Sequence, residues 1–148
     1  MRLSMARDSA ALLAALEAIV GAMEAAWRAG DAMAVKRLDT DFHWAFVRHA
    51  GNAYLEAAYA DIAPLVEALR YRFMDTAGYR NQAYEEHRAM LRLLVAGRTE
   101  KAAALLGDHV QRTKEFQANV DWSTGRSRRK FYRTRDYRLL LAAGETAA

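Results

Sequence analysis

Asp39 and His43 are the residues whose types and spacing first suggest chemistry. They lie four positions apart in a segment, residues 31–50, whose apolar pattern predicts a helix, so both side chains project from one face. Phe42 and Phe46 belong to that face, which is therefore predicted to point inward. A buried polar group without a partner costs roughly 2–7 kcal/mol, so the carboxylate and the imidazole are expected to share one.

Two further histidines are predicted to complete this site. His87 lies among apolar residues on the inward face of a predicted helix over residues 82–96, and His109 has the same position in the next predicted helix. One carboxylate and three imidazoles suit Zn, Ni, Mn or Fe, and they leave one or two coordination positions for water or a small anion. The predicted ligands of one divalent metal ion are Asp39, His43, His87 and His109.

The metal prediction rests on the whole set, because a single histidine on an apolar face is more often a satisfied core residue. Two related sites do not fit the spacing. A di-iron bundle needs Glu-x-x-His pairs, but Tyr84 and Leu106 stand three positions before His87 and His109. The His-Glu-x-x-His signature of zinc proteases does not occur either.

Composition predicts one all-α domain. The chain of 148 residues is 53% hydrophobic, with one proline and no cysteine, which favours a single buried core without disulfides or thiolate ligands. We expect a single antiparallel helical bundle of five to six helices, with the metal site in its core. The bundle is predicted to span residues 9–120, and residues 121–148 form a basic C-terminal extension.

The predicted helices follow apolar residues at intervals of three and four. They cover about residues 9–30, 31–50, 53–74, 82–96 and 99–119, with a sixth short helix over 131–143. Residues 1–8 are interpreted as a polar lead-in and residues 75–81 as a loop. Glu17 and Glu24 interrupt the apolar stretch 10–26, which favours a buried amphipathic helix over a signal peptide or membrane span. The protein is predicted to be cytoplasmic, without membrane contact.

The net charge of +4 comes from the C-terminal extension. Residues 126–138 carry seven basic side chains against Asp136, so the bundle itself is slightly acidic. Two arginines elsewhere, Arg70 and Arg72, flank the apolar stripe of the third predicted helix. A solvated position is the favoured interpretation for each, but Arg72 is the better placed to hold a carboxylate by two parallel hydrogen bonds.

Four motifs in this order resemble a known family. They are Asp39-x-x-Phe42-His43, Ala50-Gly51-Asn52, Glu86-His87 and Asp108-His109. Over about Ser9 to Asn119 the chain resembles the FCD domain, the effector-binding domain of a large subfamily of GntR transcription regulators. The resemblance implies that the matching Asp and three His bind a divalent metal, that a small carboxylate effector completes its coordination, and that the domain forms a homodimer.

The resemblance also sets an expectation about DNA. In that family a winged helix-turn-helix precedes the domain, and here it would lie before Met1, together with the first helix and its effector-binding arginine. We therefore expect this chain to be a fragment or a stand-alone relative. Specific DNA binding is expected only through a winged helix-turn-helix, which is absent from this chain. The tail is expected to give weak, salt-sensitive binding at most.

The favoured interpretation is a metal-containing, ligand-sensing domain of a transcription regulator without catalytic activity. A small metalloenzyme on a helical bundle, as in the DinB-like transferases, is the main alternative. Such an enzyme needs a general base beside the open metal position, and its candidates are Asp41, Tyr84 and Glu86. Glu86, however, is assigned to the solvated face of its helix. A metal-free helical dimerisation module is the third alternative.

Overall fold

The described part of the chain folds as a bundle of five α-helices. A computed structural model describes residues 1–73, 77–121 and 126–127, with the side chains of residues 1–71 and 78–115. The helices are α1 (Arg2–Arg28), α2 (Ala32–Arg48), α3 (Ala53–Phe73), α4 (Ala77–Val95) and α5 (Thr99–Asn119). This confirms the all-α prediction. After α5, the two-residue strands β1 (Val120–Asp121) and β2 (Arg126–Ser127) pair antiparallel, which the sequence did not predict. The helix predicted over 131–143 lies outside the described residues.

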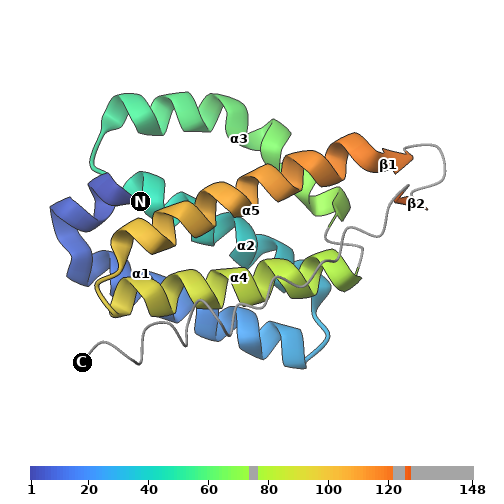
Figure 1. Cartoon of the computed structure of the whole chain (residues 1–148), viewed down its shortest axis with the longest axis horizontal. Helices are drawn as coiled ribbons and strands as arrows, with labels where there is room; N and C mark the ends of the chain where they lie inside the picture. Colours follow the sequence, from blue (N-terminus) through green and yellow to red (C-terminus); the bar gives the residue numbers. More distant parts are fainter. Residues whose placement is uncertain (74–76, 122–125, 128–148) are drawn as a thin grey trace.

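The helices are arranged with α1 and α3 on opposite sides of the bundle (Figure 1). α1 packs against α2, α4 and α5, and α4 packs along α5, whereas α3 packs mainly against α2. Each of the connections from α1 to α2 and from α4 to α5 is too short for anything but an antiparallel hairpin. The molecule is thus two helical hairpins with α3 attached along one side.

Apolar side chains from α1, α2, α4 and α5 form the main core. Leucine dominates in α1, aromatic residues in α2 and aliphatic residues in α4, as expected for helices that bury one stripe each. The fully buried members include Leu12, Leu16, Phe42, Met90, Leu94 and Ala102. α3 contributes none of the residues of this core cluster.

Three glycines end helices as predicted. Gly30, Gly51 and Gly97 have φ values of +72°, +59° and +69°, in the left-handed region that other residues adopt at a cost. Gly51 is the most constrained, because the Arg7 guanidinium lies where its Cβ would stand. The ends of α1, α2 and α4 are therefore encoded locally, by the glycines in the turns that follow them.

The N-terminal residues are helical, so their interpretation as a polar lead-in was wrong. α1 begins at Arg2, and its one break is at Asp8, where φ is −154° and ψ is 82°. Asp8 then caps the second part of α1, because its Oδ1 accepts a hydrogen bond from the Ala11 N–H at 3.0 Å. Likewise α4 begins at Ala77, inside the segment predicted as a loop.

By length and composition α1 is also apolar enough to cross a membrane, the one such helix among the described residues. Part of its hydrophobicity is explained by the core of this fold. Leu12, Leu16, Val20 and Met23 are buried against the other helices. A core helix at the N-terminus satisfies the same compositional test, so the finding is weak evidence for a membrane span.

The stripe predicted as the inward face of α3 is largely exposed, and that prediction was wrong. Leu55, Ile62 and Leu65 are 42%, 54% and 67% exposed. α3 is held to α2 instead by polar and aromatic contacts. The Trp44 indole Nε1–H donates to Glu67 Oε1 at 3.1 Å, and the Trp44 and Tyr59 rings meet edge to face at 4.7 Å. Pro64 lies inside the helix without ending it.

Ser4 provides a test of how the N-terminal turn supports the bundle. Its buried hydroxyl donates to the Phe46 carbonyl at 2.6 Å, whose helical donor, the Ala50 N–H, bonds to Val47 instead. Ser4→Ala leaves this buried carbonyl unpaired, so we expect a loss of about 1–3 kcal/mol in the free energy of unfolding.

Urea denaturation of Ser4→Ala and of Ser9→Ala measures this effect. Ser9 is exposed on the same helix, and its substitution is expected to change the stability by less than about 0.5 kcal/mol. Equal stability of the two variants would show that the Ser4 bond contributes nothing.

Candidate metal centre

Three histidines from three helices meet in the interior of the bundle. His43 of α2, His87 of α4 and His109 of α5 bring one ring nitrogen each to within 4.8 Å of the others. The centroids of their rings are 5.0–5.3 Å apart. His87 is held in place by the Phe42 ring, which stacks on its imidazole at 4.0 Å. The predicted convergence of the three histidines is therefore what the structure shows.

The acid of the predicted ligand set lies beside this cluster. Asp39 is buried, and its Oδ1 is 3.7 Å from His87 Nε2, while its Oδ2 is 3.4 Å from Arg70 Nη1. The Asp39 carboxylate thus lies between an imidazole and a guanidinium. In a tetrahedral zinc site with bonds of 2.0–2.1 Å, ligand atoms are about 3.3 Å apart. This is closer than the 3.7 Å between Asp39 Oδ1 and His87 Nε2 and than the separations of up to 4.8 Å among the histidine nitrogens.

The protonation states suit a metal. Burial lowers the pKa of His43 and of His87 well below the ordinary histidine range, and the neighbouring cation and imidazoles lower it further. Burial raises the pKa of Asp39, against the opposing effect of Arg70 and His109. His43 and His87 are therefore neutral at pH 7, which is the form that binds metal ions.

Unpaired buried atoms provide the fit test for a metal ion. Within the described part of the chain, His43 Nε2, both ring nitrogens of His87 and Asp39 Oδ2 have no hydrogen-bond partner. Buried polar atoms in proteins are nearly always satisfied, so the unpaired ring nitrogens of His43 and His87 need an explanation. A cation bound by His43 Nε2 and one ring nitrogen of His87 would satisfy two of these atoms, and the residues fit one.

Glu86 is a functional residue that the sequence interpretation missed. It was assigned to the solvated face of α4, but it is buried, and its Oε2 lies 2.6 Å from His109 Nδ1. Gln82 Nε2 donates to its Oε1 at 2.8 Å, and Arg112 Nη2 lies 2.7 Å from the same oxygen. Accepting the Nδ1–H of His109, Glu86 leaves the Nε2 of that ring to bind a metal.

Arg70 was also misjudged, since its predicted position was a solvated stripe edge. The structure buries it to 4% exposure next to Asp39. Its Nε and Nη2 atoms have no hydrogen-bond partner in the described residues, and this pair forms the side-on fork that matches a carboxylate. Arg72 belongs to the last turn of α3, and its side chain lies outside the described residues, so its role remains a prediction.

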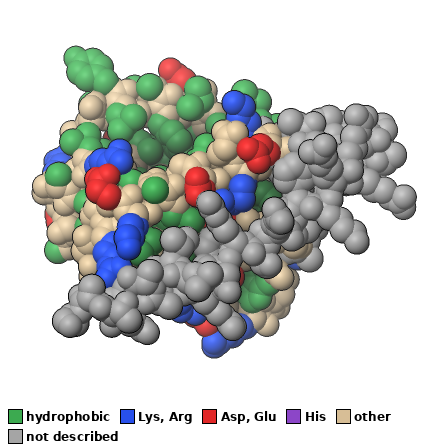
Figure 2. Space-filling model, viewed as in Figure 1, with side chains coloured by type: hydrophobic (Ala, Val, Ile, Leu, Met, Phe, Trp, Pro, Cys, Tyr) green, Lys and Arg blue, Asp and Glu red, His purple; other side chains and the backbone are tan. Residues whose placement is uncertain are grey.

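A cavity of about 340 Å³ opens beside the cluster, between α3 and α5. His43, Arg70 and His109 line its buried end. Ile62, Val110 and their neighbours line the rest, and hydrophobic side chains gather on the α3 side of the molecule (Figure 2). This volume is in the range of small-molecule sites. The exposed stripe of α3 is therefore, in part, the wall of a cavity.

The groups considered as general bases do not face the cavity. Asp41 is exposed, and Tyr84 stacks on Trp27 at 5.8 Å on the α1 side of α4. Glu86 is engaged by His109, Gln82 and Arg112, as described above. None of the three lines the cavity.

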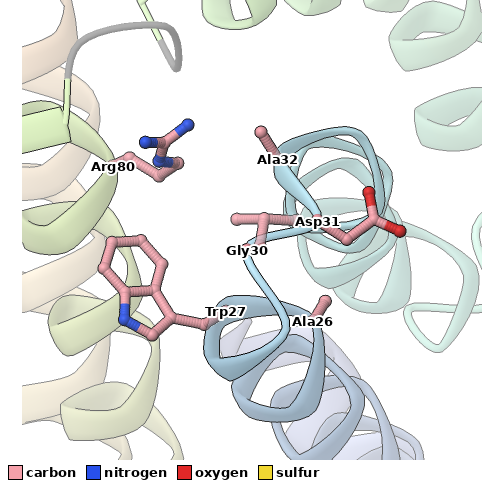
Figure 3. Close-up of a pocket in the computed structure, with 7 residues that line it drawn as sticks. Ala26, Trp27, Gly30, Asp31, Ala32 and Arg80 are labelled. Carbon is pink, nitrogen blue, oxygen red and sulfur yellow. The ribbon is translucent and has the colours of Figure 1, made fainter.

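A second pocket, of about 70 Å³, lies at the turn between α1 and α2 and shares no lining residue with the cavity (Figure 3). Its cation, Arg80, lies 5.7 Å from the centroid of the Trp27 ring. The Asp31 carboxylate points away from the pocket, because it caps α2 by accepting a hydrogen bond from the Ala34 N–H. This pocket lies at the packing interface of α1, α2 and α4, and it lacks the convergent polar groups of the cavity beside the histidine cluster.

Comparison with known proteins gave one match. The family model of the FCD domain matches residues 1–112, which include α1 to α4 and most of α5 with all three clustered histidines. No curated protein and no solved structure matches the chain significantly.

The Glu86 contact generates a prediction about metal affinity. Glu86→Gln weakens the charge-assisted bond that orients His109, and loss of such an outer-shell partner lowers metal affinity about 10–100-fold. Competition of the purified protein with a chromogenic chelator for Zn²⁺ measures the change. The matched control is Glu85→Gln on the neighbouring exposed position, where only a surface pair with Arg88 is lost. Equal zinc affinity in the two variants would remove Glu86 from the site.

Proposed function

The chain belongs to the FCD domain family, the effector-binding domains of GntR-type transcription regulators, and from this membership we propose that it senses a small organic acid through a bound divalent metal. The observation that carries the proposal is the histidine cluster at the buried end of a cavity. The metal is of the Zn, Ni or Mn class, with Asp39, His43, His87 and His109 as its protein ligands. The acid binds from the cavity side.

The charges of the site support an anionic effector. Two carboxylates, Asp39 and Glu86, are each paired with a guanidinium, from Arg70 and Arg112, and the imidazoles of His43 and His87 are neutral. These charges cancel, so a divalent metal gives the centre a net charge of about +2. In an interior of low dielectric constant such a charge strongly favours a bound anion.

Arg70 is the proposed anchor for the carboxylate. It lines the cavity, and its Nε and Nη2 atoms make no hydrogen bond within the described residues, while its guanidinium also interacts with the Tyr59 hydroxyl. A bidentate guanidinium–carboxylate pair is among the stronger hydrogen-bonded contacts in proteins. The sequence pattern predicted this role for Arg72, and substitution of each arginine by lysine distinguishes the two.

The proposal extends to the context of the domain. It acts as a homodimer in the cytoplasm and controls DNA binding by a winged helix-turn-helix that is not among these 148 residues. Catalysis is not part of the proposal, because FCD domains are regulatory and the groups weighed as general bases lie outside the cavity.

The metal assignment predicts a linked loss of binding and stability. His87→Ala removes a central ligand, so the variant should lose stoichiometric zinc. It should also lose the stabilisation that zinc provides, about 2.7 kcal/mol at a metal concentration one hundred times the dissociation constant. Elemental analysis and thermal unfolding with and without Zn²⁺ measure both. The control is His49→Ala, which removes the histidine outside the cluster.

Full zinc occupancy in His87→Ala would contradict the assignment. Zinc loss in both variants to the same degree would point to non-specific binding instead.

The anchor assignment predicts the effect of a conservative substitution. Arg70→Lys keeps the charge beside Asp39 but loses the planar fork, so affinity for carboxylates should fall about tenfold or more while zinc stays bound. Calorimetric titration of the zinc-loaded protein with a panel of mono-, di- and tricarboxylates measures the change. Arg72→Lys is the matched variant on the same helix. A loss in Arg72→Lys alone would return the anchor role to Arg72.

A further inference from the structure

The cavity beside the histidine cluster is polar at its buried end and apolar at its mouth. Arg70 and His109 at the inner end are each 4% exposed, whereas Ile62 and Val110 are 54% and 56% exposed. Val66 and Leu69 of α3 line the wall between these two regions. Apolar residues are usually buried and charged residues exposed, but in this cavity the polar residues are buried and the apolar residues are exposed. A ligand that matches it places its charged head inward and an apolar body outward.

The outer part of the cavity offers few hydrogen bonds. The Thr113 hydroxyl donates to the His109 carbonyl at 3.1 Å and shares a 2.8 Å hydrogen bond with the Tyr79 hydroxyl. The Tyr59 hydroxyl is engaged by Arg70. Lys114, which is exposed, is the remaining polar side chain that lines the described cavity. A hydroxyl-rich ligand body would therefore bury polar groups without partners, at a cost in affinity.

We infer that the effector is a monocarboxylate with an apolar body, aliphatic or aromatic, rather than a hydroxylated or multiply charged acid. This inference rests on the proposed function and specifies its ligand class. The carboxylate binds at the metal and Arg70, and the body lies between α3 and α5 over Ile62 and Val110. Covering these side chains removes apolar surface from water, and each buried methylene contributes about fourfold in affinity.

The experiment compares acids of matched length on the zinc-loaded protein by isothermal titration calorimetry. Acetate, butanoate and hexanoate test the apolar body, and affinity is expected to rise about fourfold per methylene until the cavity is filled. Succinate and malate have the four carbons of butanoate but add charge or a hydroxyl, and both are expected to bind more weakly than butanoate. Adipate has the six carbons of hexanoate and a second charge, and it is expected to bind more weakly than hexanoate. Zinc content is measured after each titration.

Two substitutions on α3 localise the body of the ligand. Ile62→Asn places an amide in the cavity wall and should flatten the rise in affinity from acetate to hexanoate. Leu65→Asn is the matched control, because Leu65 is similarly exposed on the same helix but does not line the cavity. Its rise with chain length should equal that of the unmodified protein.

The outcomes separate this inference from the proposed function. Tighter binding of succinate or malate than butanoate would overturn the apolar class while supporting an acid sensor. Tighter binding of adipate than hexanoate would do the same in favour of a diacid that reaches Lys114. Absence of binding by every acid to the zinc-loaded protein would contradict the proposed function and the inference with it.

Discussion

Burial of charge at the centre of an apolar bundle is the constraint on which the rest of the structure depends. Asp39 and Glu86 are each at most 2% exposed, and an isolated carboxylate in such a place costs several kcal/mol. Each is compensated by an arginine from a different helix, Arg70 from α3 and Arg112 from α5. The imidazoles of His43, His87 and His109 lie between these two ion pairs. The polar centre therefore ties together α2, α3, α4 and α5, which the leucine-rich core alone does not do.

This arrangement explains why α3 can be so lightly packed. α3 contributes nothing to the main apolar cluster, and much of its apolar stripe is exposed. Its position is set instead by the Asp39–Arg70 pair, the Trp44–Glu67 hydrogen bond and the Trp44–Tyr59 ring contact. Directional contacts of this kind hold a helix at a distance from its neighbours, whereas apolar packing would pull it inward. These contacts leave the cavity between α3 and α5, which begins beside Arg70 and His109.

The sequence predicted those parts of the fold that depend on periodicity. Apolar residues at intervals of three and four predicted the five helices, and glycines predicted the ends of α1, α2 and α4. The same intervals identified His43, His87 and His109 as inward residues that meet. Periodicity could not place Glu86, because a residue next to His87 is rotated by about 100° and its burial depends on which helix packs there. The contact of Glu86 with Arg112, which compensates its burial, becomes apparent only in the three-dimensional structure.

The errors on α3 have the same origin. A stripe of leucine and isoleucine looks identical whether it faces a core or a ligand cavity, so the sequence could not show that Ile62 lines a cavity while Leu65 faces solvent. Charged residues beside such a stripe are usually solvated, and Arg70 is an exception because Asp39 lies opposite it. The first turns of α1 carry a buried hydrogen bond from Ser4 to the Phe46 carbonyl, which no local sequence pattern predicts.

The shared position of Asp39 has a consequence for how metal and ligand act on each other under the proposed function. One carboxylate oxygen faces His87 and the other faces Arg70, so the same charge serves the metal site and the anchor. A divalent ion bound beside Asp39 would partly neutralise its carboxylate and so weaken the attraction between Asp39 and Arg70. The guanidinium then gains more from a carboxylate that enters the cavity. Coupling between two binding events is reciprocal, so an acid held by Arg70 must strengthen metal binding by the same factor. Under the proposed function, one buried aspartate would therefore couple metal and acid binding without a distant conformational change.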